Sequence, residues 1–176
     1  MPSSSLTVGT FNCTGIKSSI EYIAQNICTK CDIVALQETW LLPNDLAVCD
    51  NNHPSFCAFG TSSVDVGAGV LRGRPHGGLA FMYRRTYEAV LSPVTFDDDR
   101  ILGLQYRDGT QSILFLNVYC HTQSNDNYDK FVSLLGRLAA IINSHENDAF
   151  IVLGDFSVVM LFCILLRRRV CACVRA

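Results

Sequence analysis

Short segments of the chain carry apolar residues in the two patterns that are typical of strands. Residues 6–12 alternate apolar and polar positions, and residues 33–36 form a continuous apolar run bounded by Asp32 and Gln37. Asp108-Gly109 separates two such runs and predicts a tight hairpin turn. The expected strands are residues 6–12, 33–36, 56–59, 78–83, 89–95, 101–106, 112–119 and 150–153.

Two other segments predict helices because their apolar residues recur three or four positions apart. In residues 16–27 the apolar face consists of isoleucines, with Ser18 and Ser19 near the start. In residues 131–142 it is formed by phenylalanine, leucine and isoleucine, after a capping residue at Asp126 or Asn127. Outside the strand at 56–59 we expect residues 40–77 to form loops, and the glycine-rich stretch from Gly60 to Gly78 to be a long surface loop.

The composition is that of one folded domain with an unusual tail. The chain has 176 residues, of which 49% are hydrophobic and 17% charged, and this balance excludes a disordered chain. Residues 1–157 contain all 16 acidic residues and ten of the 14 basic ones, so their net charge is −6. Residues 158–176 contain four arginines and no acidic residue. We therefore expect a domain over residues 1–156 and an aberrant apolar and arginine-rich tail, outside the domain, over residues 157–176.

The charge of the domain excludes one class of function. An acidic body argues against a protein that binds nucleic acid through bulk positive charge alone. It remains compatible with an enzyme that meets phosphates through a bound metal ion, because such an ion needs acidic ligands.

The nine cysteines indicate a reducing compartment. No apolar signal segment follows Met1, so free thiols are expected, and an intracellular location, nuclear or cytoplasmic, is favoured. Cys28 and Cys31 form a single C-x-x-C, for which further zinc ligands occur only at irregular spacing. We interpret them as a buried pair at a helix end rather than a metal or redox site.

The apolar tail raises the alternative of a membrane anchor. Val158–Leu166 is wholly apolar and Arg167–Arg169 follows it, as at the end of a membrane segment. A span of about 20 residues would have to include Asp155 near its centre, at a cost of about 2.5–3.5 kcal/mol. Membrane association is therefore not favoured.

Polar residues at the ends of apolar strands are the candidate functional residues. Asn12, Glu38, Tyr119 and Asp155 each follow or end an apolar run, so we expect them to project from one rim of a β core. Carboxylate and carboxamide oxygens suit Mg²⁺, which can polarise a phosphoryl oxygen. A phenol can hydrogen-bond a phosphate, and a second carboxylate can orient or deprotonate water.

These residues belong to motifs that together resemble the endonuclease/exonuclease/phosphatase superfamily. The motifs are, in order, TFNCTG, DIVALQETW, HGGLAFMYRR, ILFLNVYCHT and IVLGDF, and they extend over residues 6–156. They look most like the apurinic-type endonuclease domain of non-LTR retrotransposons. The resemblance implies an α/β (α+β) fold, a four-layer α/β/β/α sandwich of two mixed sheets, in which the second sheet is incomplete because the chain is truncated at its C-terminal side.

The resemblance also implies roles for individual residues. Glu38 would be the direct ligand of the catalytic Mg²⁺, with Mn²⁺ as the alternative, and Asn12 would help to hold it. Tyr119 matches the tyrosine that contacts the scissile phosphate, and Asp155 matches the aspartate that positions or activates the attacking water. Arg100 is a candidate phosphate contact.

Two histidines are further candidates for substrate contact. His121 lies two residues beyond Tyr119 and is a candidate phosphate contact, and His76 precedes two glycines. Neither matches the general base of the family, which belongs to a late S-D-H motif.

The sequence departs from the family pattern at its C-terminal side. Ser157 stands where the G-D-F-N motif has asparagine, and no S-D-H motif follows in the printed sequence. We therefore expect a truncated endonuclease fragment with DNA as its substrate, no obligate protein partner, little or no nicking activity and an exposed apolar patch on the inner sheet faces. Two alternatives stay open: another branch of the superfamily (a repair endonuclease, a deadenylase or an inositol or lipid phosphoesterase), and a non-catalytic interaction fragment.

Overall fold

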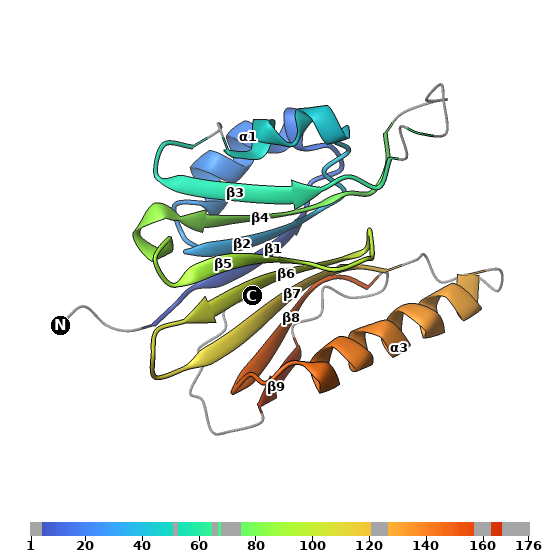
Figure 1. Cartoon of the computed structure of the whole chain (residues 1–176). Helices are drawn as coiled ribbons and strands as arrows, with labels where there is room; N and C mark the ends of the chain where they lie inside the picture. Colours follow the sequence, from blue (N-terminus) through green and yellow to red (C-terminus); the bar gives the residue numbers. More distant parts are fainter. Residues whose placement is uncertain are drawn as a thin grey trace.

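Two mixed β-sheets face one another at the centre of the protein, in a computed structural model that describes residues 5–50, 53–64, 67, 75–120, 127–156 and 163–166 (Figure 1). The first sheet has the strand order β1-β2-β4-β3. Only β1 and β2 are parallel, and the other neighbours are antiparallel. Its strands are β1 (Val8–Asn12), β2 (Ile33–Gln37), β3 (Phe56–Thr61) and β4 (Leu79–Arg84).

The second sheet has the strand order β5-β6-β7-β8-β9. Its one parallel pair is β7 and β8, and the predicted turn at Asp108-Gly109 joins β6 to β7. The Asp108 carboxylate accepts hydrogen bonds from the backbone of Thr110 and Gln111, which stabilises this turn. The strands are β5 (Leu91–Thr95), β6 (Ile101–Arg107), β7 (Ser112–Tyr119), β8 (Ala149–Asp155) and β9 (Cys163–Leu166).

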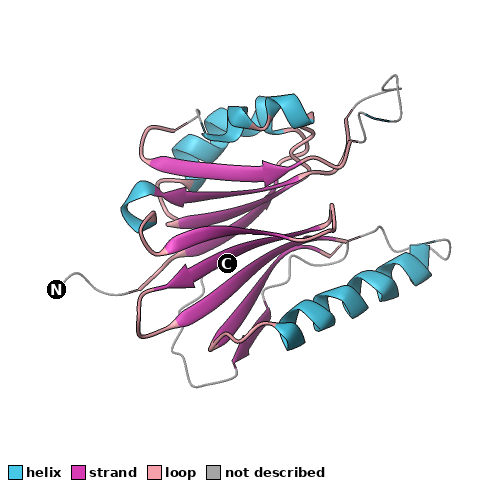
Figure 2. Cartoon of the chain, in the orientation of Figure 1, coloured by secondary structure: helices cyan, strands magenta, loops and turns pink. Residues whose placement is uncertain are grey.

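Helices cover the outer face of each sheet (Figures 1 and 2). On the first sheet lie α1 (Ile16–Tyr22), its π-helical continuation η1 (Ile23–Ile27) and the short α2 (Ala47–Asp50). On the second sheet lies α3 (Tyr128–Ser144), whose buried residues are Leu134 and Leu138. The 3-10 turns η2 (Pro43–Asp45) and η4 (Arg85–Tyr87) complete the described helical elements. The predicted α/β/β/α sandwich is therefore confirmed.

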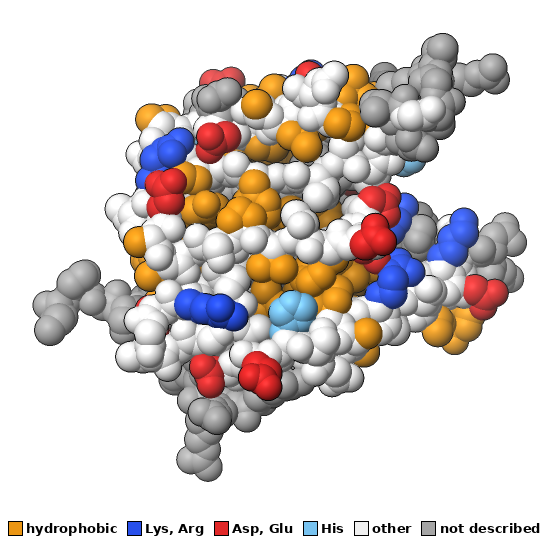
Figure 3. Space-filling view, in the orientation of Figure 1, with side chains coloured by type: hydrophobic (Ala, Val, Ile, Leu, Met, Phe, Trp, Pro, Cys, Tyr) orange, Lys and Arg blue, Asp and Glu red, His pale blue; other side chains and the backbone are white. Residues whose placement is uncertain are grey.

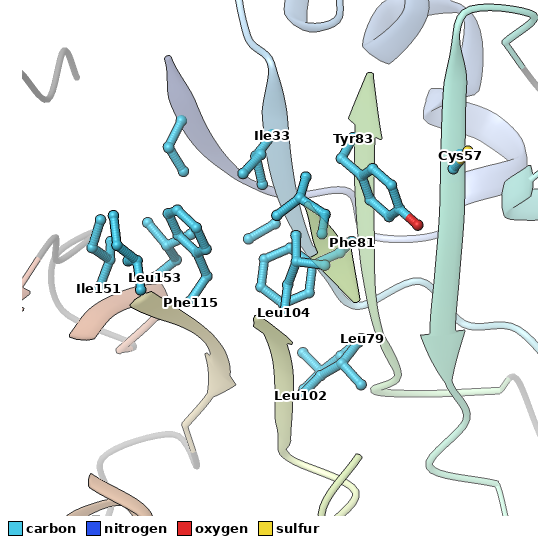
Figure 4. Packing of buried hydrophobic residues seen from close by; sticks show 14 of the residues in the cluster. Ile33, Cys57, Leu79, Phe81, Tyr83, Leu102, Leu104, Phe115, Ile151 and Leu153 are labelled. Carbon is cyan, nitrogen blue, oxygen red and sulfur yellow. The ribbon is translucent and has the colours of Figure 1, made fainter. Parts of the chain in front are cut away.

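The main core lies between the two sheets, as Figure 4 shows for the apolar side chains that meet there. Phe81 and Leu79 from β4 meet Leu102 and Leu104 from β6, and all four are fully buried. Contrary to the exposed inner patch that we expected, the large exposed apolar side chains of the described chain lie on the helices: Tyr22, Tyr128, Val132 and Leu135. Figure 3 shows apolar side chains gathered in several groups across the middle of one face, with polar side chains and backbone between them.

The structure corrects the predicted elements at three places. The helix expected over residues 16–27 changes to π geometry at Ile23. Residues 40–77 contain α2, because Cys49 packs beneath the first sheet with Phe56 and Met82. The strand expected at 89–95 begins at Leu91, since residues 88–90 form a turn after η4.

Part of the tail is joined to the second sheet. The backbone of β9 pairs with β8 in antiparallel register, with Cys163 opposite Val152 and Leu166 opposite Ala149. Hydrogen bonds between strands do not depend on which side chains they carry, so an apolar tail segment can extend an open sheet edge. Ser157 lies outside the described residues, and the domain boundary at residue 156 stays a prediction.

None of the helices in the described part of the chain is both long and apolar enough to cross a membrane.

Candidate active site

Four strand ends from the two sheets meet at one edge of the sandwich. Asn12 ends β1, and Glu38 directly follows its parallel neighbour β2. Tyr119 ends β7 and lies opposite Asp155, which ends β8. Since the carboxyl ends of parallel strands meet at one edge of a sheet, each parallel pair places two polar side chains side by side.

Hydrogen bonds join these four side chains across the two sheets. The Asn12 amide Nδ2 donates to Glu38 Oε1 at 2.8 Å and to Asp155 Oδ2 at 2.7 Å. The Tyr119 hydroxyl donates to Glu38 Oε1 at 2.9 Å. The structure therefore brings together all four residues that the sequence placed at a common rim, and we call them the rim cluster.

Backbone strain is concentrated beside the rim cluster. Thr14, Glu38 and Trp40 are the non-glycine residues of the described chain with a positive φ, at 41°, 53° and 55°. Such conformations cost about 1–3 kcal/mol each and persist only where the surroundings impose them. Strained residues gather at functional sites, and here Glu38 belongs to the rim cluster while Thr14 and Trp40 each lie two residues from one of its members.

The loop that carries Glu38 is held by backbone hydrogen bonds on both sides. Gly15 N–H donates to the Glu38 carbonyl at 2.8 Å, and Trp40 N–H donates to the Gly77 carbonyl at 3.0 Å. Gly15 allows a close approach, because a Cβ there would lie 2.9 Å from Cε3 of the Trp40 ring. These contacts impose the strained backbone of Glu38 and aim its side chain at Asn12 and Tyr119.

The Tyr119 phenol is a persistent proton donor. Burial, followed by the hydrogen bond to Glu38 and the charge of its carboxylate, raises the pKa of Tyr119 to about 12. The phenol therefore keeps its proton throughout the neutral range and can donate to an anion.

Arg100 provides positive charge next to Tyr119. Its guanidinium carbon lies 5.2 Å from the centre of the Tyr119 ring, within the range of a cation–π contact. Its Nη1 also donates to the Tyr119 carbonyl at 3.3 Å. Arg100 directly precedes β6 and lies beside Tyr119 of the rim cluster, and its contact with phosphate stays a prediction.

Of the two candidate histidines, the structure describes only His76, which does not join the rim cluster. His121 lies outside the described residues. His76 is exposed and precedes Gly77, whose carbonyl binds the loop of Glu38. A substrate contact for either histidine stays a prediction.

Two buried amides next to the rim cluster were not predicted from the sequence. Gln37 and Asn117 are both fully buried, and Gln37 Nε2 donates to Asn117 Oδ1 at 2.6 Å. The signal was available, because Gln37 ends one apolar run and Asn117 interrupts another between Leu116 and Val118. A polar residue buried in such a run needs a partner, and the sequence does not say which one.

The rim cluster suits a hard divalent cation. Two carboxylates converge on the single amide nitrogen of Asn12, so their negative charges face a common point. Among the described residues no group of three or more His, Cys, Asp or Glu side chains could hold an ion. Mg²⁺ is commonly bound through one or two carboxylates and several waters, and the cluster fits that pattern better than an all-protein cage.

The sequence profile of the Endonuclease/Exonuclease/phosphatase family matches residues 9–160. The chain belongs to this family. Members of the family are hydrolases, among them nucleases and phosphatases, and they generally use divalent metal ions. The match includes all four residues of the rim cluster.

Solved structures of this family share the fold of the chain. The 3′ phosphatase NExo from Neisseria, solved with a product DNA hairpin, is 15% identical with a TM-score of 0.59, over 85% of this chain and 56% of NExo. An AP endonuclease from Archaeoglobus fulgidus is 19% identical with a TM-score of 0.54, over 84% of this chain and 56% of that chain. A mannosyl-6-phosphatase from Bacteroides thetaiotaomicron is 20% identical with a TM-score of 0.59, over 88% of this chain and 66% of that chain.

These similarities establish the fold and leave the substrate open. The chain spans little more than half the length of NExo and of the archaeal endonuclease. No curated protein sequence matches the chain.

Proposed function

We propose that this protein is a Mg²⁺-dependent phosphodiesterase that acts on DNA, of the kind found in the nicking endonucleases of non-LTR retrotransposons. The observation that carries the proposal is the rim cluster, in which two carboxylates, an amide and a protonated phenol from both sheets converge. The sequence motifs around these residues support the retrotransposon type.

Glu38 and Asn12 are the residues that would hold Mg²⁺, or Mn²⁺ in its place. Glu38 presents carboxylate oxygens, which are the ligands that these hard cations prefer. The Asn12 amide turns its nitrogen toward the carboxylates of Glu38 and Asp155, and its oxygen accepts from the backbone N–H of Thr14 at 3.1 Å. Asn12 would thus help to hold the ion by orienting the two carboxylates. When bound, the ion polarises a phosphoryl oxygen and stabilises the leaving oxygen. The strained backbone of Glu38 keeps its carboxylate at the cluster before any ligand arrives, which reduces the cost of ordering the site on binding.

Tyr119 and Asp155 would act on the phosphate and on water. The Tyr119 hydroxyl, which donates to Glu38 in the free protein, is the donor available to a phosphate oxygen. The Asp155 carboxylate is within hydrogen-bond reach of Asn12 and can accept a proton from water or orient it. Arg100, whose guanidinium lies over the Tyr119 ring, adds positive charge beside the phenol.

DNA is the substrate class that the combined observations favour. One protein with this fold, NExo, was solved with a DNA hairpin. The domain itself has a net charge of −6, so contact with phosphates depends on the metal and Arg100 rather than on a basic surface.

Metal binding is the first test, and Trp40 is a convenient probe for it. Trp40 is the single tryptophan of the chain and lies two residues from Glu38. We expect Mg²⁺ to change the Trp40 fluorescence in a saturable way in the wild-type chain and in Glu21→Gln, a control that removes an exposed carboxylate of α1. Glu38→Gln should weaken this response at least about tenfold. An equal response in Glu38→Gln would exclude the rim cluster as the metal site.

Cleavage is the second test. Because no residue of the printed chain matches the general base of the family, we expect weak Mg²⁺-dependent nicking of supercoiled plasmid, which Glu38→Ala abolishes. Loss of one member of a catalytic unit leaves only the residual effects of binding and polarisation. Preferential hydrolysis of a phosphorylated sugar, an inositol phosphate or poly(A) RNA would assign the protein to another branch of the family. Metal binding without any cleavage would favour the non-catalytic alternative.

A further inference from the structure

A pair of buried amides crosses the interface between the two sheets. Gln37 is the last residue of β2 in the first sheet, and Asn117 lies in β7 of the second. Both are fully buried, at the edge of a core that is otherwise apolar. Gln37 Nε2 donates to Asn117 Oδ1 at 2.6 Å.

Each amide is also bound to its surroundings. Asn117 Nδ2 donates to the carbonyl of Leu36 at 2.9 Å and to that of Ala80 at 3.0 Å, two neighbouring residues of the first sheet. Gln37 exchanges hydrogen bonds with the Thr10 hydroxyl on β1. One side chain of the second sheet therefore makes three hydrogen bonds to the first, and the network has no unpaired donor.

This amide pair lies directly beneath the rim cluster. Gln37 immediately precedes Glu38, and Asn117 is two residues before Tyr119, so Asn117 and Tyr119 lie on the same face of β7. The bond from Gln37 to Asn117 and the bond from Tyr119 to Glu38 thus join the same two chain segments at successive levels.

The position of the rim cluster depends on how the two sheets are placed relative to one another. Asn12 and Glu38 belong to the first sheet, and Tyr119 and Asp155 to the second. Apolar contacts such as those of Phe81 and Leu104 resist separation of the sheets but have little directional preference. Hydrogen bonds have a definite length and direction, and buried ones are costly to break.

We propose that the Gln37–Asn117 pair is a positioning device that sets the alignment of the two sheets and so holds the rim cluster in place. Neither amide touches substrate or metal in this role. The importance of this pair for catalysis rests on the proposed function. Its role in aligning Glu38 with Tyr119 is independent of the proposed function.

Stability and positioning can be separated by replacing both amides. The double variant Gln37→Leu/Asn117→Leu removes both polar groups together and leaves no amide without its partner. Replacing a buried polar pair with apolar residues of similar size is often neutral or stabilising. Gln37→Leu alone is the second variant, since it keeps both bonds from Asn117 to the backbone. Gln105→Leu is the matched control, because the buried Gln105 amide binds only within its own sheet, at Tyr106, Ser112 and Ile113.

The first measurement is the coupling between Tyr119 and Glu38 in the metal-free chain. In NMR spectra of the chain labelled with 13C-tyrosine, the ring resonance of Tyr119 is assigned as the one that disappears in Tyr119→Phe. Glu38→Gln should shift this resonance in the wild-type and Gln105→Leu backgrounds. In the double variant we expect that shift to be lost, and in Gln37→Leu to be reduced, while urea unfolding shows stability no lower than that of Gln105→Leu. An undiminished shift in either variant would overturn the proposal.

The second measurement links the device to metal binding. The Mg²⁺ concentration that half-saturates the Trp40 fluorescence change should rise about tenfold in the double variant and stay unchanged in Gln105→Leu. An unchanged value in the double variant would show that the pair does not position the site. If the wild-type chain gives no Mg²⁺ response, the proposed function fails, and the tyrosine measurement still decides whether the pair aligns the sheets.

Discussion

The Tyr119 hydroxyl donates a hydrogen bond of 2.9 Å to the Glu38 carboxylate, and this bond joins the second sheet to the first. The two residues are separated by 81 positions in the chain. Because of this contact, the Glu38 carboxylate and the Tyr119 hydroxyl, a proton donor, lie together at one edge of the sandwich.

Asn12 separates two carboxylates, and Asn12→Asp should make the folded chain dependent on divalent cations. The change removes the two donated hydrogen bonds and places a third carboxylate beside Glu38 and Asp155. In EDTA we expect the free energy of unfolding to fall by about 1–3 kcal/mol. Mg²⁺ should restore more stability in Asn12→Asp than in Asn12→Ala, as measured by urea unfolding. Equal effects of Mg²⁺ on both variants would contradict a cation site at Asn12.

Tyr119 should contribute to stability only while it keeps its proton. Its pKa is raised from 10.0 to about 12 in the folded chain, so the unfolded chain releases the proton first. The contribution is therefore fully present below about pH 10 and is lost as the pH rises through about 12. Because the phenol is only half-buried and water screens it, we expect a loss of about 1 kcal/mol.

The alkaline effect is measured as the difference between the wild-type chain and Tyr119→Phe, since buried thiols also titrate in this range. Urea unfolding at several pH values should show the wild-type advantage shrinking between about pH 10 and 12. A constant difference over that range would mean that the folded phenol titrates normally.

Gly154 should be intolerant of any side chain. A Cβ at this position would overlap the carbonyl oxygen of Val118, which lies opposite Gly154 in the parallel pair of β7 and β8. We expect Gly154→Ala to lower the free energy of unfolding by about 3 kcal/mol, because the two strands must move apart. Gly136→Ala is the control, since a Cβ there meets nothing within 4 Å on α3. It should stabilise the chain by about 0.5–1 kcal/mol. Similar effects of the two substitutions would contradict the packing described here.

The buried thiols should be protected from alkylation in the folded chain. Burial raises the pKa of Cys13 and of Cys49 from 9.0 to about 12, which lowers the thiolate fraction near neutral pH roughly a thousandfold. With iodoacetamide near pH 8, site-resolved mass spectrometry should show the half-buried Cys31 reacting before these two. Equal rates for Cys13 in native buffer and in urea would show that it is accessible.

Local pattern was sufficient to predict most of the architecture. Alternation and apolar runs predicted the strands at 33–36 and 112–119, because one or both faces of each strand must be buried. The same patterns placed Asn12, Glu38, Tyr119 and Asp155 at strand ends, and motif order supplied the family. These features depend on residues that are close together in the chain, and the periodicity of apolar residues reports on such neighbours.

The details that only the tertiary structure decided depend on contacts between distant segments. The pairing of Gln37 with Asn117 joins positions 80 residues apart, and no local pattern names the partner of a buried amide. The positive φ of Glu38 is imposed by Gly15 and by the loop at Gly77, which the pairing of β1, β2 and β4 brings together in the first sheet. The sequence by itself thus determined which residues end the strands. How closely those ends approach one another was decided by the alignment of the two sheets. Apolar periodicity specifies that one face of a strand is buried, but it does not specify which element packs on that face or in which register the strands pair.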